Sequence, residues 1–163
     1  MMPAPAMNGS STRRLDSDDL ERVITIDRAY TGRVRRRFFE RRFAAAEAHP
    51  DDFIQVGVMR GGALRGFVFA RLLRGEFGRE QLAGVLDVIG VELESQDRGV
   101  GQSLMKDVVG KLRAAGARTL HSQAEWSNTG LLHFFAASGF KLAPRLALER
   151  SVTKPMHEPS EDE

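Results

Sequence analysis

One segment, residues 85–115, combines an aliphatic run, a turn with two glycines and an amphipathic stretch. The run 85–93 is rich in aliphatic residues and predicts a buried strand. The stretch 102–115 predicts a helix, because its apolar residues recur on one helical face: Leu104, Met105, Val108, Val109 and Leu112. The turn from Gln96 to Gly101 opens that helix, where the first backbone N–H groups lack internal partners and the helix dipole is positive. This arrangement therefore predicts a phosphate-binding site.

Two familiar nucleotide-binding loops do not fit this turn. A Walker loop requires a Lys directly after its glycine, and Gln102 and Ser103 follow Gly101 here. A dinucleotide fingerprint requires a third glycine where Leu104 stands. We expect Gly99 and Gly101 to let the backbone approach an anion closely, because a side chain at either position would block it. The alternative for the turn by itself is a tight connection without a ligand.

The run Gln96-Asp97-Arg98-Gly99-Val100-Gly101 resembles the acetyl-coenzyme A (acetyl-CoA) loop of the GNAT superfamily of N-acetyltransferases. A second signature of that family, an Asn followed by an apolar helix and a closing Gly-Phe, resembles the stretch from Asn128 to Phe140. The order of the expected elements is also similar to the family's over about residues 12–151. The two signatures occur in the family's order with a strand between them, and together they are more specific than either segment alone.

The resemblance implies an α+β fold in three α/β/α layers, with a twisted mixed sheet of six or seven strands and about four helices on both faces. It implies an N-acetyltransferase in which a primary amine of a small molecule or protein directly attacks the thioester of acetyl-CoA. In the family the two central strands splay apart, and the pantetheine arm of the cofactor would pair there with backbone groups of Val91 and Leu93. The other implied cofactor contacts are Gln96, Asp97, Arg98, Gly99, Val100, Gly101, Gln102, Ser103, Asn128, Phe134 and Phe135. A homodimer is implied by analogy only.

The distribution of polar and apolar residues along the chain predicts one domain over residues 12–152, with a disordered tail at 1–11 and a flexible acidic tail at 153–163. Helices are expected after an N-cap at Asp16 or Ser17 and over 31–48, where Val34, Phe38 and Phe43 have core-like spacing. The remaining expected elements are strands at 12–15, 53–59, 63–73, 82–93 and 119–125, a helix at 128–138, and one or two closing strands within 140–152.

Composition narrows the function classes. The chain of 163 residues has no cysteine, which excludes a disulfide framework, a thiolate metal site and a cysteine nucleophile. We find neither a membrane-length apolar run nor a signal peptide, and therefore expect a cytoplasmic protein without a membrane partner. The four histidines have no metal-ligand spacing, so we expect no metal. The formal net charge of +2 gives no reason to expect a nucleic-acid partner.

Two carboxylates are candidate catalytic bases, since an amine that is protonated near neutral pH must lose a proton before it attacks. Asp87 places a charge inside an apolar strand, and Glu92 lies four residues before Gln96. Their spacing of five predicts opposite faces of an unbroken strand, which a bulge near Gly90 would change. The alternatives are an Asp87 that is hydrogen-bonded to neighbouring backbone and a Glu92 in solvent.

The position seven residues after Asn128 departs from the family. By the resemblance it is often a Tyr that protonates the departing thiolate, and here it is Phe135, which has no proton to give. Tyr30 is the only tyrosine, and the sequence shows no route from it to the site. This departure favours, as an alternative, an acyl-CoA-binding module with weak or no catalysis.

An arginine-rich stretch precedes these motifs. Recognition of an acidic substrate or of nucleic acid is one interpretation, and a solvated helix face above an aromatic core stripe is the favoured one. Trp126 would either cover the cofactor arm or pack at a strand end, and packing is favoured. The stretch contains Arg33, Arg35, Arg36, Arg37, Arg41 and Arg42, interleaved with Phe38, Phe39 and Phe43.

Overall fold

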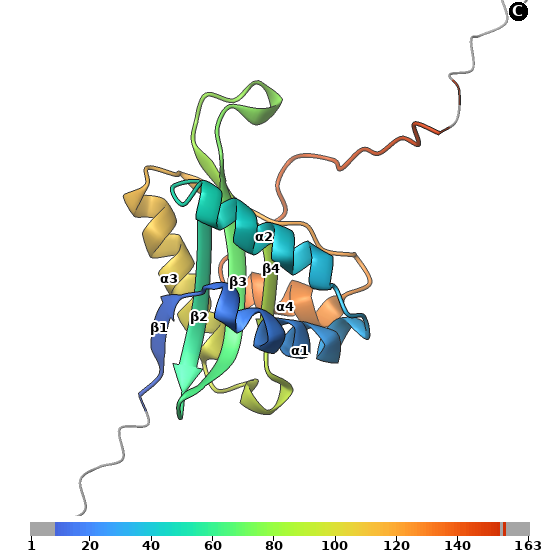
Figure 1. Ribbon diagram of the computed structural model, residues 1–163. Coiled ribbons are helices and arrows are strands. Elements are labelled where there is room, and N and C mark those ends of the chain that lie inside the picture. Colours follow the sequence, from blue (N-terminus) through green and yellow to red (C-terminus); the bar gives the residue numbers. More distant parts are fainter. Residues whose placement is uncertain (1–8, 154, 156–163) are drawn as a thin grey trace, which may run out of the picture.

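The central feature of the computed structural model, which describes residues 9–153 and 155, is a five-stranded sheet (Figure 1). Its strands lie in chain order, and all neighbours are antiparallel except β4 and β5, which are parallel. Most of both expected tails therefore lies outside the described residues, whereas Ser11 already begins β1. The strands are β1 Ser11–Arg14, β2 Phe53–Arg60, β3 Ala63–Leu73, β4 Ala83–Val91 and β5 Thr119–His121.

Four α-helices cover the sheet, two on each face, as expected from the sequence. Helices α1 (Leu20–Thr31) and α2 (Arg36–Ala48) lie in front of the sheet in Figure 1, and α3 (Val100–Ala114) and α4 (Thr129–Ala137) lie behind it. None of the described helices is both long and apolar enough to cross a bilayer. The α+β class and three-layer arrangement are therefore confirmed.

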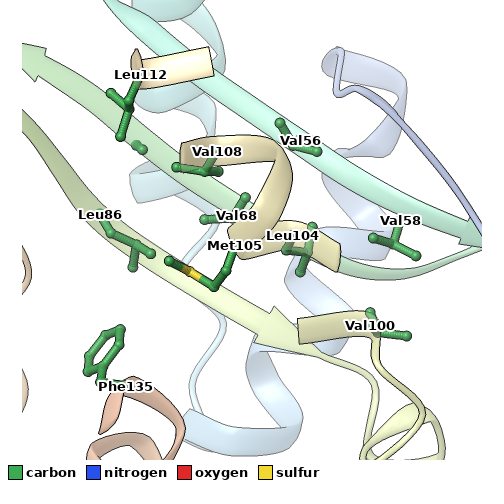
Figure 2. Packing of buried hydrophobic residues seen from close by; sticks show 11 residues of the cluster. Val56, Val58, Val68, Leu86, Val100, Leu104, Met105, Val108, Leu112 and Phe135 are labelled. Atoms are coloured by element: carbon green, nitrogen blue, oxygen red, sulfur yellow. The ribbon is translucent and has the colours of Figure 1, made fainter. Parts of the chain in front are cut away.

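A separate hydrophobic core fills each side of the sheet. Behind it, Leu104 and Val108 of α3 are completely buried against Val56 and Val68 of the central strands (Figure 2). In front of it, aromatic rings of α2 and β3 pack edge to face, with 5.8 Å between the ring centroids of Phe39 and Phe67. Burial of these apolar faces stabilises the layers, since removal of apolar surface from water is the main favourable term in folding.

The expected count of six or seven strands is wrong for the described residues. Residues 140–152 contain no strand, and Leu142, Leu146, Leu148 and Val152 are each at least 87% exposed there. Pro144 has no N–H to donate to a ladder, which disfavours a strand across the middle of that segment. The strand expected at 119–125 is also shorter, because β5 ends at His121.

The second helix begins five residues later than expected. Gly32 adopts a left-handed φ of 66° and ends α1, so the chain turns before α2 starts at Arg36. Val34 consequently lies in the connection and is 58% exposed, whereas Phe39 enters the core with no exposed surface. The hairpin expected at residues 60–62 is present, with left-handed φ values at both Gly61 and Gly62.

Strand β4 changes its pairing twice along its length. Phe69 of β3 pairs with Val88 and Ala70 pairs with Leu86, which leaves Asp87 as the extra residue of a β-bulge. On the other edge of β4 the ladder with β5 ends at the pair Val85 and His121. No strand of the described chain covers the stretch of β4 beyond that pair, and we call this stretch, residues 86–91, the open edge of β4.

Candidate functional site

The turn at residues 96–101 joins the end of β4 to α3. Asp97 and Gly99 both adopt left-handed φ values, 59° and 78°, and α3 begins at Val100. The N–H of Ser103 donates to the carbonyl of Gly99 at 3.0 Å. The backbone N–H groups of Val100, Gly101 and Gln102 thus precede the first intrahelical hydrogen bond and are available to an anion.

The two glycines of the turn are needed for different reasons. A Cβ at Gly99 would meet no atom within 4 Å, so the requirement there is the left-handed backbone. A Cβ at Gly101 would stand 2.7 Å from Cε2 of Phe134, so the crowding there comes from α4. In the protein without a ligand, glycine is therefore required at position 101 by the Phe134 ring, and not by the approach of an anion.

The second sequence signature packs directly beside the first. Asn128 is the N-cap of α4, and its side-chain oxygen accepts a hydrogen bond from the N–H of Leu131 at 3.2 Å. The amide of Gln102 donates to the hydroxyl of Ser138 at 3.2 Å, which ties the start of α3 to the end of α4. Segments that are separated by some thirty residues thus form one surface.

Phe135 is a core residue. Its side chain is 7% exposed and belongs to the cluster that contains Leu86 of β4 and Met105 of α3 (Figure 2). Its ring centroid lies 4.7 Å from that of Phe140. Position 135 therefore contributes apolar packing beneath β4 and no dissociable proton.

Backbone groups of Val91 point toward the open edge of β4. The N–H of Glu92 donates to the carbonyl of Arg65 at 2.8 Å, and antiparallel residues alternate in the direction of their hydrogen bonds. Ile89 and Val91 therefore direct their N–H and C=O groups away from β3. Leu93 lies beyond the strand in a short 3-10 turn, Leu93–Ser95, and is 55% exposed.

Tyr30 lies at this edge, which the sequence did not indicate. Its hydroxyl donates to the carbonyl of Val91 and accepts a hydrogen bond from the side-chain amide of Gln96 at 2.5 Å. Burial raises the pKa of Tyr30, and the hydrogen bonds with Gln96 and Val91 offset the effect only in part. Helical spacing in the sequence could have indicated this position. Tyr30 lies seven residues after the buried Val23 and therefore shares its face of α1.

Asp87 and Glu92 lie on the same face of the sheet, because a bulge interrupts β4 and opposite faces were expected only for an unbroken strand. The bulge is at Asp87 rather than near Gly90, and it turns Asp87 and Val88 toward the same side. Asp87 pairs with Arg42 of α2 at 3.1 Å, and Glu92 pairs with Arg22 of α1. Both carboxylates thus face the layer formed by α1 and α2.

Two arginines hold each of these carboxylates. Besides Arg42, Asp87 contacts Nε of Arg71 at 3.3 Å, and its side chain is only 12% exposed. Besides Arg22, Glu92 accepts from Nη1 of Arg65 and from the hydroxyl of Ser95, both at 2.9 Å. Burial opposes the charge of Glu92, but these hydrogen bonds outweigh it and keep the pKa of Glu92 below its ordinary value.

His121, the last residue of β5, is a second group that the sequence did not single out. Leu120 packs into the rear core, so its neighbour His121 faces the side of α1 and α2. Burial, together with the charges of Arg145 and Arg79, lowers the pKa of His121, so its imidazole is neutral near neutral pH. No three His, Asp or Glu side chains of the described chain come together as a metal ion would need.

The arginine-rich stretch is partly neutralised. Arg35 pairs with Asp27 at 2.5 Å and Arg36 with Glu21 at 2.7 Å, and Phe39 and Phe43 are buried beneath them, as the favoured interpretation predicted. Arg33, Arg37 and Arg41 are exposed and form no salt bridge with a described residue. A shallow surface hollow is lined by Phe38, Arg41, Arg42 and Ala45.

Trp126 does not pack at a strand end. Its side chain is 87% exposed in the connection between β5 and α4, so the packing interpretation is wrong.

The arrangement suits a long ligand with an anionic end. The free N–H groups at the start of α3 can receive phosphate oxygens, and the open edge of β4 can pair with an extended chain that carries amides. The turn joins these two features directly, so one molecule can occupy both.

Comparisons with known proteins identify the family and the fold. The family model described as "Acetyltransferase (GNAT) family" matches residues 20–140. The aminoglycoside N-acetyltransferase AAC(6')-Iy in complex with CoA is 20% identical, with a TM-score of 0.74 over 92% of this chain and 99% of that chain. A transcriptional regulator from Bacillus halodurans C-125 is 14% identical, with a TM-score of 0.75 over 88% of this chain and 99% of that one.

A third solved structure, glucosamine-6-phosphate N-acetyltransferase from Arabidopsis thaliana, is 15% identical, with a TM-score of 0.66 over 88% of this chain and 99% of that chain. At these identities the similarity shows the fold alone. No curated protein matched the sequence.

Proposed function

Because the chain belongs to the acetyltransferase (GNAT) family, we propose that it transfers an acetyl group from acetyl-CoA to a primary amine of a small molecule or protein by direct attack. The observation that carries this proposal is the junction between the free N–H groups of α3 and the open edge of β4. Acetyl-CoA has a pyrophosphate and an amide-bearing arm in that order, and the junction offers a partner for each.

The turn would hold the pyrophosphate. The backbone amides of Val100, Gly101 and Gln102 lie at the start of α3, and the helix dipole adds positive potential there. The arm would lie along the open edge, where Val91 presents its backbone groups. Phe134, against Gly101, would border the arm on the side of α4.

We assign proton acceptance to Asp87 rather than to Glu92. Asp87 lies on the bulge, two residues after Val85, the last residue of β4 that pairs with β5, and on the face covered by α1 and α2. Glu92 lies beyond the end of β4 and, in addition to two arginines like those of Asp87, accepts a hydrogen bond from Ser95, which further favours its charged form. Its main role would be to fix α1 against β3 and β4.

The charges on this face favour a neutral or anionic acceptor. Asp87 at the bulge and Glu92 beyond the end of β4 are both already paired with arginines, whereas Arg41 adds an exposed positive charge beside Arg42. Aminoglycosides are polycations near neutral pH, so we expect them to be poor acceptors here although relatives with this fold acetylate them.

Thiol release from acetyl-CoA in the presence of a panel of amines tests the proposed function, with CoA affinity measured separately by calorimetry. Amine-dependent release supports it. Tight CoA binding without turnover on any amine would instead support the non-catalytic binding module that Phe135 suggests. Absence of CoA binding would overturn both.

A further inference from the structure

Resting on the proposed function, we infer that Arg60 belongs to the pyrophosphate site, where it fixes the turn at residues 96–101 and adds its positive charge. Arg60 is the last residue of β2 and lies outside both sequence signatures. Its Nη2 donates to the carbonyl of Arg98 in the turn at 3.0 Å. The contact joins the hairpin between β2 and β3 to a residue that lies 38 positions later in the chain.

This hairpin holds the segment 92–98 at both of its ends. At the first end, the N–H of Glu92 donates to the carbonyl of Arg65 at 2.8 Å, and the guanidinium of Arg65 pairs with the Glu92 carboxylate at 2.9 Å. At the other end, Arg60 holds the carbonyl of Arg98. Nε of Arg65 also donates to the carbonyl of Arg60 at 3.2 Å, which links the two arginines. The path of the turn is therefore set by β2 and β3 as well as by its own glycines.

The contact at Arg98 fixes the direction of one N–H group of the turn. In a trans peptide the carbonyl and the following N–H point in opposite directions. Because Arg60 holds the carbonyl of Arg98, it also orients the N–H of Gly99, which donates to no described residue. That N–H directly precedes those of Val100 and Gly101 at the start of α3. A turn whose N–H groups are held in place before a ligand arrives binds an anion at a lower ordering cost.

The charge of Arg60 lies on the face of the sheet that α3 covers. Val58, two residues earlier, packs in the rear core with Val100, the first residue of α3 (Figure 2). Met59 between them packs into the front core, so Arg60 returns to the face of Val58. Since Arg60 also contacts Arg98, two residues before α3 begins, its guanidinium lies at the N-terminal end of that helix.

No described carboxylate neutralises this guanidinium. Its other acceptor is the hydroxyl of Ser10, 2.9 Å from Nη2, so both of its partners are neutral oxygens. Asp97, the acidic residue of the turn, is not one of them. A cation at the N-terminus of a helix is unfavourable, because the helix dipole is positive there. A bound anion relieves this repulsion, and the pyrophosphate of CoA is the anion that the proposed function brings to this turn.

The first test compares Arg60→Gln and Arg37→Gln with the unaltered protein by calorimetry with CoA. Arg37 is an exposed arginine of α2, on the opposite face of the sheet, and its replacement removes the same charge. We expect Arg60→Gln to bind CoA about tenfold or more weakly, as for loss of a hydrogen bond to a charged group. Arg37→Gln should stay within about threefold of the unaltered protein, because solvent ions screen a distant exposed charge. Unchanged affinity in Arg60→Gln, or an equal loss in Arg37→Gln, would overturn the inference.

The second test separates a residue of the anion site from one that serves the fold alone. The affinity of Arg60→Gln for CoA should depend less on salt concentration than that of the unaltered protein, because one charge has left the site. Its unfolding temperature without ligand should differ by less than about 4 °C. A large fall in the unfolding temperature with unchanged salt dependence would make Arg60 a structural residue only.

The third test varies the ligand. 3′-Dephospho-CoA retains the pyrophosphate, so the loss of affinity in Arg60→Gln should persist with it. A loss that appears only with CoA would assign Arg60 to the 3′-phosphate and overturn the inference. Absence of CoA binding by the unaltered protein would overturn the proposed function and this inference together, whereas CoA binding that is indifferent to Arg60 would overturn the inference alone.

Discussion

Gly101 of α3 lies so close to Phe134 of α4 that a Cβ at position 101 would stand 2.7 Å from Cε2 of the ring. This contact joins the glycine turn at the start of α3 to the apolar helix that follows Asn128. Since the turn is also where the free N–H groups are, packing between α3 and α4 sets the position of the anion site. Substitutions at this contact should therefore change stability and CoA affinity together.

We expect Gly101→Ala to destabilise the protein by about 1–3 kcal/mol, as overpacking does, and to weaken CoA binding. Thermal unfolding and calorimetry measure the two effects. Gly99→Ala is the control, because it faces open space and its cost of about 1–2 kcal/mol comes from the left-handed backbone alone. In a double-mutant cycle, Phe134→Ala should relieve the effect of Gly101→Ala but not that of Gly99→Ala. Equal coupling to both glycines would contradict this account.

Glu92→Gln should lower the free energy of unfolding by about 2 kcal/mol near pH 7, because Arg22 and Arg65 lose a charged acceptor. The folded pKa of Glu92 is below its unfolded value, so the carboxylate stabilises the fold above about pH 4.3. That contribution disappears as the pH falls through the folded pKa. Denaturant titrations between roughly pH 7 and pH 3 should show a smaller acid loss in Glu92→Gln than in the unaltered protein. Identical pH dependence in both would refute the linkage.

Asp87→Asn should reduce kcat/KM by about 10²–10⁴-fold, the range for loss of a general base. Glu92→Gln should reduce kcat/KM much less, because Glu92 lies beyond the end of β4 and away from the bulge. His121 is another possible proton acceptor on this face, so kcat/KM of His121→Asn should be compared with that of Asp87→Asn. A greater loss in His121→Asn than in Asp87→Asn would transfer the role to the histidine, whose lowered pKa keeps it neutral.

Arg41→Glu should raise KM for anionic amines and lower it for cationic ones, since Arg41 lines the hollow beside Arg42. Arg37→Glu is a matched control, because Arg37 is also an exposed arginine of α2 but does not line the hollow. Each substitution changes the charge by the same amount, so any effect of net charge is common to both. Equal changes in KM would show that acceptors bind elsewhere.

Local pattern was enough to predict much of the fold. The spacing of Leu104, Val108 and Leu112 predicted α3, and the hairpin at Gly61 and Gly62 followed from turn chemistry, because both depend on neighbours within a few residues. The prediction of closing strands within 140–152 was wrong because strands depend on residues that are distant in the sequence. A strand exists only where a neighbouring chain segment completes its ladder, and nothing in residues 140–152 states whether such a neighbour is present.

The sequence by itself determined that a glycine turn follows a buried strand and opens a helix. It also contained both segments that resemble the family signatures. Only the tertiary structure decided that Asp87 is the bulged residue, that two arginines hold each carboxylate, and that Tyr30 reaches Val91. These contacts join residues up to 61 positions apart, the separation of Tyr30 and Val91. Periodicity within one element assigns a face to each residue, but the docking of one layer on another selects its partners.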